Sequence, residues 1–138
     1  MRYLLDTNSC IAAMRAHEAV VRRMSTLAPG DCAISTVTSY ELFTGVEKCT
    51  EPAKERAKVG MLVATLQQLP FDLGAAHEAA RIRAYLEARG EMIGPYDVLL
   101  AGHAVSAGLI LVSSNTAEFC RVPGLTLENW EKPAPVAP

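Results

Sequence analysis

The 138-residue sequence has no uninterrupted hydrophobic run long enough to cross a membrane. Its longest apolar stretch, residues 98–112, is broken by glycine, histidine and serine and is shorter than the roughly 20 residues that a spanning helix needs. The chain also does not open like a secretory signal peptide, because its apolar start ends at Asp6. We therefore expect a soluble protein of the cytoplasm.

Paired cysteine motifs and a strong excess of one charge are missing too. The cysteines show neither a C-x-x-C pair nor the close spacing of a zinc site, and we interpret them as buried, reduced thiols: Cys10, Cys32, Cys49 and Cys120. The formal net charge of -2 gives no general attraction to nucleic acid, so RNA binding would need local arginine patches or metal ions. Half of the residues are hydrophobic and 20% are charged, as in an ordinary globular domain.

Apolar runs that suit strands alternate with segments of helical periodicity. Strands are expected at residues 2–5, 32–37, 69–71, 109–112 and 125–127, and helices at 9–27, from 38 onwards, and at 51–68, 73–88 and 95–107. This alternation predicts an α/β sandwich with a mostly parallel sheet covered by helices on both faces. We expect one domain over residues 1–131, followed by a disordered, proline-rich tail at 132–138.

Four oxygen-bearing side chains fall where predicted strands lead into helices. Asp6 ends the first strand, Glu41 lies in the first turn of the helix after the second, Asp97 lies in the first turn after Pro95, and Asn115 follows the strand at 109–112. Functional groups of open parallel sheets gather beyond the carboxyl ends of the strands. We therefore expect these four side chains to share one edge of the sheet.

Each of these residues also has a purely structural interpretation. Asp6 can cap a helix or a turn, Glu41 has capping-box spacing with Thr38, and Asp97 at a helix start is favoured by the helix dipole. Asn115 has capping-box spacing with Glu118, although Asn in place of Ser or Thr makes this match loose. Separate caps, however, have no reason to meet at one edge across gaps of 35 and 56 residues (41 minus 6 and 97 minus 41). A carboxylate cluster is costly unless a cation neutralises it, and Mg²⁺ prefers such oxygen ligands, so we predict a metal site suited to phosphodiester cleavage.

Motifs along nearly the whole chain resemble those of a known family. The segments are LLDTN at 4–8, SYELFTG at 39–45, IGPYDVLLAGHA at 93–104 and LVSSNTAEFCRVPGL at 111–125. In this order they resemble the successive signatures of PIN domains, and most closely those of VapC-type toxins of bacterial toxin–antitoxin pairs.

The resemblance implies an endoribonuclease that depends on Mg²⁺, with Mn²⁺ as a substitute, and that cleaves structured RNA such as tRNA or rRNA. It also implies a homodimer held in check by a VapB-type antitoxin. Carried over by motif, Asp6 and Asp97 are the principal metal ligands, and Glu41 completes the acidic pocket directly or through water. Many relatives have a fourth acid where this chain has Asn115, with Glu118 beyond it, so the number of metal ions stays open.

Three residues near these acids have less specific interpretations. Thr7 and Asn8 can supply hydrogen bonds to a ligand or serve as turn and cap residues. Gly45, one turn after Glu41, is predicted to let its helix approach a neighbouring backbone.

Two alternatives come from other functional classes. An aspartate-nucleophile phosphatase or a phospho-accepting domain also places an aspartate after an early strand, but a phosphatase of that kind usually has a second aspartate where Asn8 stands. A catalytically silent PIN fold that only binds RNA is the other alternative. The presence of Asp6, Glu41 and Asp97 argues against it, because folding does not require all three acids.

Overall fold

The computed structural model describes residues 1–132, and its centre is a five-stranded sheet. The strands are β1 (Tyr3–Leu5), β2 (Cys32–Ser35), β3 (Gln67–Leu69), β4 (Ile110–Val112) and β5 (Leu127–Glu128). Every pairing is parallel and the strand order is β3-β2-β1-β4-β5, so β1 is central. The predicted α/β class and mostly parallel sheet are confirmed.

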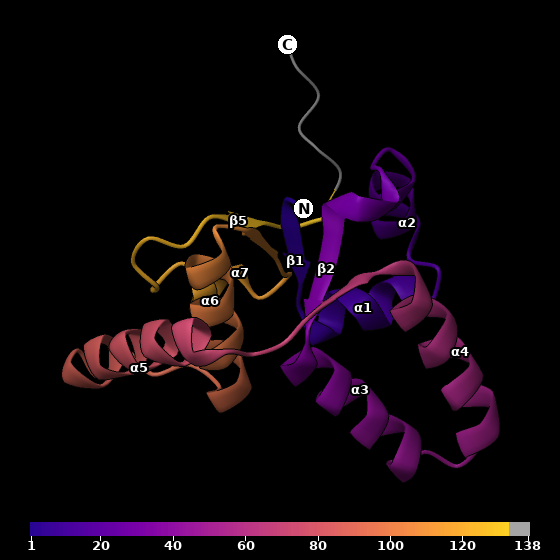
Figure 1. The fold of residues 1–138 in the computed structure, drawn as a ribbon, viewed down its shortest axis with the longest axis horizontal. Coiled ribbons are helices and arrows are strands. Elements are labelled where there is room, and N and C mark those ends of the chain that lie inside the picture. The colour runs from indigo at the N-terminus through magenta and orange to yellow at the C-terminus, as the bar shows by residue number, and fades with distance from the viewer. Residues whose placement is uncertain (133–138) are drawn as a thin grey trace.

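Seven α-helices and one short 3-10 turn surround this sheet in the described residues. The helices are α1 (Thr7–Met14), α2 (Glu18–Ser25), α3 (Thr36–Lys48), α4 (Pro52–Thr65), α5 (Leu73–Ala88), α6 (Pro95–Ala107) and α7 (Thr116–Phe119), and the 3-10 turn is Pro29–Asp31. Figure 1 shows α1 to α4 on one side of the strands and α5 to α7 on the other. None of these helices has the length and apolar character that crossing a membrane requires.

Alternation along the central strand sends its side chains into two hydrophobic clusters. Leu4 packs with α5 and α6, whereas its neighbours Tyr3 and Leu5 pack with α1 to α4. All three side chains are buried. This is the pattern of a strand covered by helices on both faces. It fixes the register in which β1 pairs with its neighbours, and Asp6 lies at the carboxyl end of the strand.

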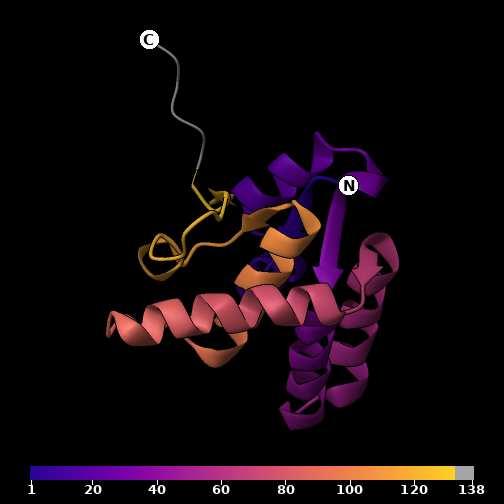
Figure 2. The same ribbon diagram turned by 60° about the vertical axis from the view of Figure 1, so that its left-hand side comes forward.

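Helices α5 and α6 make the closest approach between two helices of the fold, and Figure 2 shows α5 lying across α6. A Cβ atom added at Gly102 of α6 would lie 2.4 Å from the backbone nitrogen of Ala79 in α5. From the sequence, such a contact was predicted at Gly45 instead. That prediction is wrong, because a Cβ at Gly45 would meet nothing within 4 Å.

Two predicted helices begin or end elsewhere in the structure. The helical segment at 9–27 is divided into α1 and α2 at Ala16, whose φ is 57°. Helix α3 begins at Thr36 because Ser35 accepts a hydrogen bond from the Val37 N–H, so the predicted capping box that starts at Thr38 is wrong. Glu41 is consequently the sixth residue of α3 and has no capping role.

The remaining differences are small. The edge strand expected at 69–71 is β3 at 67–69, and the strand expected at 125–127 is β5 at 127–128. The cysteines are free as predicted, but only Cys10 and Cys32 are buried, whereas Cys49 is partly accessible and Cys120 is exposed. The predicted disordered tail at 132–138 falls, apart from Lys132, outside the described residues.

Candidate functional site

Asp6 lies at the carboxyl end of β1, where the chain turns directly into α1. Its side chain accepts a hydrogen bond from the Ser9 N–H at 2.8 Å, so Asp6 does cap this helix. The residue is only 3% exposed. Burial raises the pKa of Asp6 above its ordinary value, while hydrogen bonds from Ser113 and Ser9 act in the opposite direction. A cap alone does not require a carboxyl that is buried and hard to ionise, because a serine caps an exposed helix equally well.

Asp97 lies in the first turn of α6, as predicted. Its pKa is raised to about 6, first by burial and then by the negative charges of Asp6, Glu118 and Glu41. Carboxylates from four separate segments of the chain therefore act on one another at this position. Such effects act over short distances, so the acids that contribute to this shift lie near Asp97 at the edge of the sheet.

Glu41 points from α3 toward the start of α1. Thr7 donates a hydrogen bond from Oγ1 to Glu41 Oε1 at 2.6 Å, across 34 residues of sequence. This bond fixes one carboxylate oxygen, and within residues 1–132 the other, Oε2, has no hydrogen-bond partner. Thr7 therefore orients Glu41, a role that the sequence did not reveal because nothing local specifies the pair.

Asn115 joins the cluster through its side-chain amide. Asn115 Nδ2 donates to Glu118 Oε2 at 2.9 Å and more weakly to Asp97 Oδ2 at 3.5 Å. It makes no capping bond to α7. The amide thus bridges two carboxylates, and Glu118 belongs to the same group of side chains as the four predicted residues.

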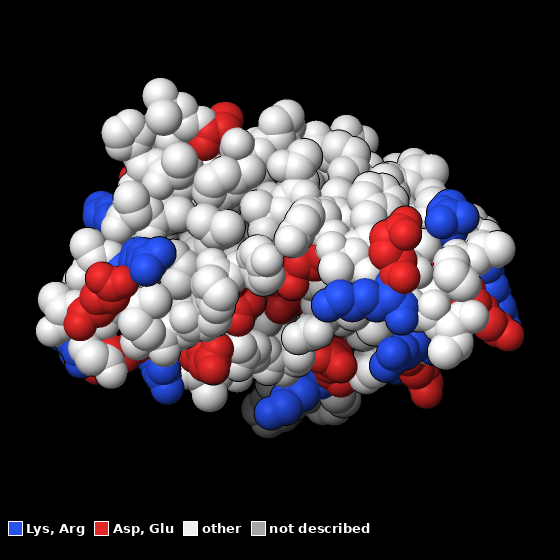
Figure 3. Space-filling view, turned by 90° about the horizontal axis from the view of Figure 1, so that it is seen from below, with Lys and Arg blue, Asp and Glu red and all other residues white. Residues whose placement is uncertain are grey.

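We name Asp6, Glu41, Asp97 and Glu118 the acidic cluster. Figure 3 views the edge toward which β1 and β2 run, and acidic side chains there line a hollow near the middle of the face. None of the ion pairs found within residues 1–132 involves a member of the cluster. The charge that these carboxylates carry when ionised is therefore not balanced by lysine or arginine.

The donor atoms of the acidic cluster suit a hard divalent cation. Within residues 1–132, no three acidic, histidine or cysteine side chains already stand around one point as a finished metal site. Mg²⁺ does not need such a cage, because it commonly binds one or two carboxylates and keeps several water ligands. The residues present therefore fit Mg²⁺ through oxygen chemistry and uncompensated charge.

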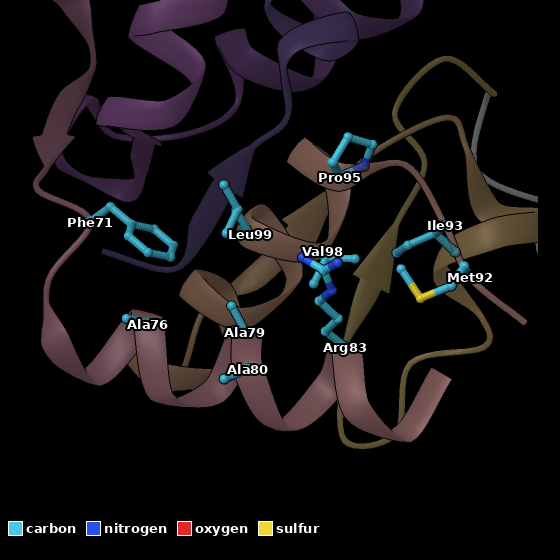
Figure 4. Close-up of a pocket in the computed structure, with 10 residues that line it drawn as sticks. All are labelled: Phe71, Ala76, Ala79, Ala80, Arg83, Met92, Ile93, Pro95, Val98 and Leu99. Atoms are coloured by element: carbon cyan, nitrogen blue, oxygen red, sulfur yellow. The ribbon is translucent and has the colours of Figure 1, made fainter. Parts of the chain in front are cut away.

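Two clefts lie close to these elements. One, of about 280 Å³, lies between α1, α3 and α4 and has Arg15 and Glu41 in its wall. The other, of about 360 Å³, lies between α5 and α6 (Figure 4), and its wall is apolar except for Arg83. The second cleft contains no member of the acidic cluster. Its larger volume is therefore no reason to assign it a part in the chemistry of that cluster.

The chain is similar in sequence to proteins that are named as nucleases. The family model described as PIN domain matches residues 3–125. The chain is 42% identical over 130 residues to the "tRNA(fMet)-specific endonuclease VapC" of Shigella flexneri, covering 94% of this chain and 98% of that protein. It is 34% identical over 134 residues to "Ribonuclease VapC2" of Rickettsia felis, covering 96% and 100%.

The fold is similar to solved structures of the same kind. The crystal structure of DNA-bound VapBC from Salmonella typhimurium contains a chain that superposes with a TM-score of 0.90 at 37% identity. The match covers 94% of this chain and 98% of that chain.

Proposed function

Because this chain belongs to the PIN domain family, as a ribonuclease toxin of the VapC type, we propose that it cleaves structured RNA by hydrolysis that depends on a divalent metal ion. The observation that carries the proposal is the group that Asp97, Glu118 and Asn115 form at the carboxyl edge of the sheet, where the Asn115 amide donates to both carboxylates. The raised pKa of Asp97 agrees with it, because burial and then the charges of Asp6, Glu118 and Glu41 disfavour its ionised form. Folding alone gives no reason to hold these charges together. The family assignment also replaces the phosphatase alternative.

We propose that Asp6 and Asp97 hold Mg²⁺, or Mn²⁺ in its place. A bound ion of this kind lowers the pKa of water and offsets charge on phosphoryl oxygens. Glu41, oriented by Thr7, has Oε2 free to accept a proton or a hydrogen bond from an attacking water. Asn115 links the Asp97 and Glu118 side chains, because its amide group donates a hydrogen bond to each carboxylate.

The substrate that we propose first is tRNA(fMet), because relatives at 42% and 38% identity are named as endonucleases specific for it. The solved relatives include VapBC complexes, and we propose that a VapB-type antitoxin binds this chain as well. A homodimer is the assembly that we expect for the toxin.

The proposal is tested by single substitutions assayed on a tRNA(fMet) transcript. Asp6→Asn, Glu41→Gln and Asp97→Asn should each reduce cleavage by orders of magnitude. Glu47→Gln is the matched control, because Glu47 is an exposed acid on the same helix as Glu41. Full cleavage by the three site variants would reject the assignment, and absence of cleavage by wild type would favour a silent RNA-binding PIN domain.

A further inference from the structure

Two tyrosines from different helices form an exposed pair. Tyr40 of α3 is 56% exposed and Tyr96 of α6 is 41% exposed. Their ring centroids lie 5.8 Å apart with the planes inclined by 53°. Tyr96 donates a hydrogen bond from its hydroxyl to that of Tyr40 at 3.4 Å. By contrast, Tyr3 and Phe119 are fully buried.

The pair stands directly beside the acidic cluster. Tyr40 precedes Glu41 and Tyr96 precedes Asp97 in the sequence, and α3 contacts α6. The two rings therefore border the place where the proposed cleavage would occur.

Packing of the fold does not explain these aromatic side chains. Neither ring belongs to the two hydrophobic clusters that cover the sheet in the described residues. Each leaves a large apolar face in water, next to carboxylates that repel phosphate groups. The net charge of -2 does not attract the RNA backbone to this edge. Stacking of a base on an aromatic ring is an attraction that does not depend on the charge of the protein.

We propose that Tyr40 and Tyr96 form a stacking platform for an unpaired nucleobase of the RNA substrate, next to the phosphate that is cleaved. The proposal rests on the ribonuclease function proposed above. Proteins commonly read RNA by splaying unpaired bases onto aromatic side chains. The platform makes Tyr40 and Tyr96 positioning residues that hold the strand, while the acidic cluster carries the chemistry.

Binding can be measured separately from cleavage with an Asp6→Asn protein that also carries Tyr40→Trp. The native Trp130 is only 5% exposed, so the new indole is the tryptophan that RNA reaches. The probes are a single-stranded RNA hexamer and the same hexamer with abasic sugars at every position. We expect fluorescence quenching by the first and little by the second.

Adding Tyr96→Ala to that protein should weaken binding of the hexamer about tenfold, in the range typical for one lost base–aromatic stack. Tyr85→Ala is the matched control, because Tyr85 is a 39% exposed tyrosine on α5. Quenching by the abasic strand equal to that by RNA would overturn the proposal. Binding unaffected by Tyr96→Ala would also overturn it.

Cleavage kinetics distinguish stacking from a structural tie between the helices. Tyr40→Ala and Tyr96→Ala should raise KM about tenfold with little change in kcat, whereas Tyr40→Phe and Tyr96→Phe should keep the wild-type KM because the ring remains. If the phenylalanine variants show the same rise in KM as the alanine variants and also melt at lower temperature, the contact between the hydroxyl groups is structural. The proposal is then rejected.

The results also separate this proposal from the proposed function. Absence of cleavage by wild type rejects the ribonuclease function, while the binding experiment with Asp6→Asn still decides the platform. If the alanine variants lose affinity for a VapB-type antitoxin but keep RNA binding, the surface belongs to the antitoxin and the stacking proposal is wrong.

Discussion

Replacing Asp97 by asparagine should make the metal-free protein more stable at pH 7.5, although the change removes an acid from the first turn of a helix. Two effects of opposite sign on the free energy of unfolding determine this result. Losing a favourable interaction with the helix dipole costs about 0.3 to 1 kcal/mol. Removing the charge of Asp97 relieves the cost of burying that charge and its repulsion from Asp6, Glu118 and Glu41.

The magnitude follows from the pKa of Asp97, which rises from 3.8 to about 6. About two pKa units correspond to roughly 3 kcal/mol of penalty on the charged folded state. Since Asp97 is only partly buried, solvent screening reduces this to about 1 to 2 kcal/mol. After subtraction of the dipole effect, we expect a net gain of about 1 kcal/mol in the free energy of unfolding.

The direction of the shift in the Asp97 pKa also determines how the stability depends on pH. A raised pKa means that the folded protein binds the proton more tightly than the unfolded chain, so the penalty is full above about pH 6 and fades as the pH falls toward 3.8. The stability difference between Asp97→Asn and wild type should therefore shrink steadily when the pH is lowered from roughly 7.5 to 4.5.

The assay is urea unfolding of both proteins in chelator and in Mg²⁺. Mg²⁺ at 100 times its Kd should stabilise wild type by about 2.7 kcal/mol and Asp97→Asn much less. A variant that is less stable than wild type at pH 7.5, with an undiminished response to Mg²⁺, would show that Asp97 serves the helix and not the metal.

Four further outcomes are expected. Thr7→Val should reduce cleavage about tenfold or more with little loss of stability, because Glu41 loses a charge-assisted hydrogen bond, while Thr7→Ser should retain activity. Gly102→Ala should lower the free energy of unfolding by about 1 to 3 kcal/mol in urea, whereas Gly45→Ala should be neutral or stabilising. Cleavage at subsaturating Mg²⁺ should decline below about pH 6, because protons compete for Asp97. Light scattering at micromolar concentration should give a dimer, and a monomer would contradict that assembly.

Helix limits were predictable where the sequence contains a strong local signal. Helices α5 and α6 have the expected ranges, because Gly90 and Gly108 adopt positive φ after them and Pro95 starts the second. The break at Ala16 carried no such signal, since alanine rarely adopts a positive φ. With this break, Cys10 of α1 and Val20 of α2 both lie in the same hydrophobic cluster.

The meeting of the acids was predictable from topology, because parallel strands bring their carboxyl ends to one edge. The partners of each acid were not. The bond from Thr7 to Glu41 and the bridge from Asn115 to Glu118 and Asp97 depend on how helices from distant parts of the chain pack together. The start of α3 shows the same limit, because the sequence predicted a cap at Thr38, whereas Ser35, which the prediction placed in the preceding strand, caps the helix.

The central claim is most directly tested by incubating the purified protein with a tRNA(fMet) transcript in Mg²⁺, in chelator, and in chelator followed by excess Mg²⁺ or Mn²⁺. We predict cleavage at a defined position in the first condition, none in the second, and recovery in the third. Asp6→Asn, prepared in parallel, should be inactive in all three, which controls for a contaminating nuclease. Cleavage by wild type that persists in chelator, with the same ends and without activity in the Asp6→Asn protein, would contradict the dependence on a metal ion.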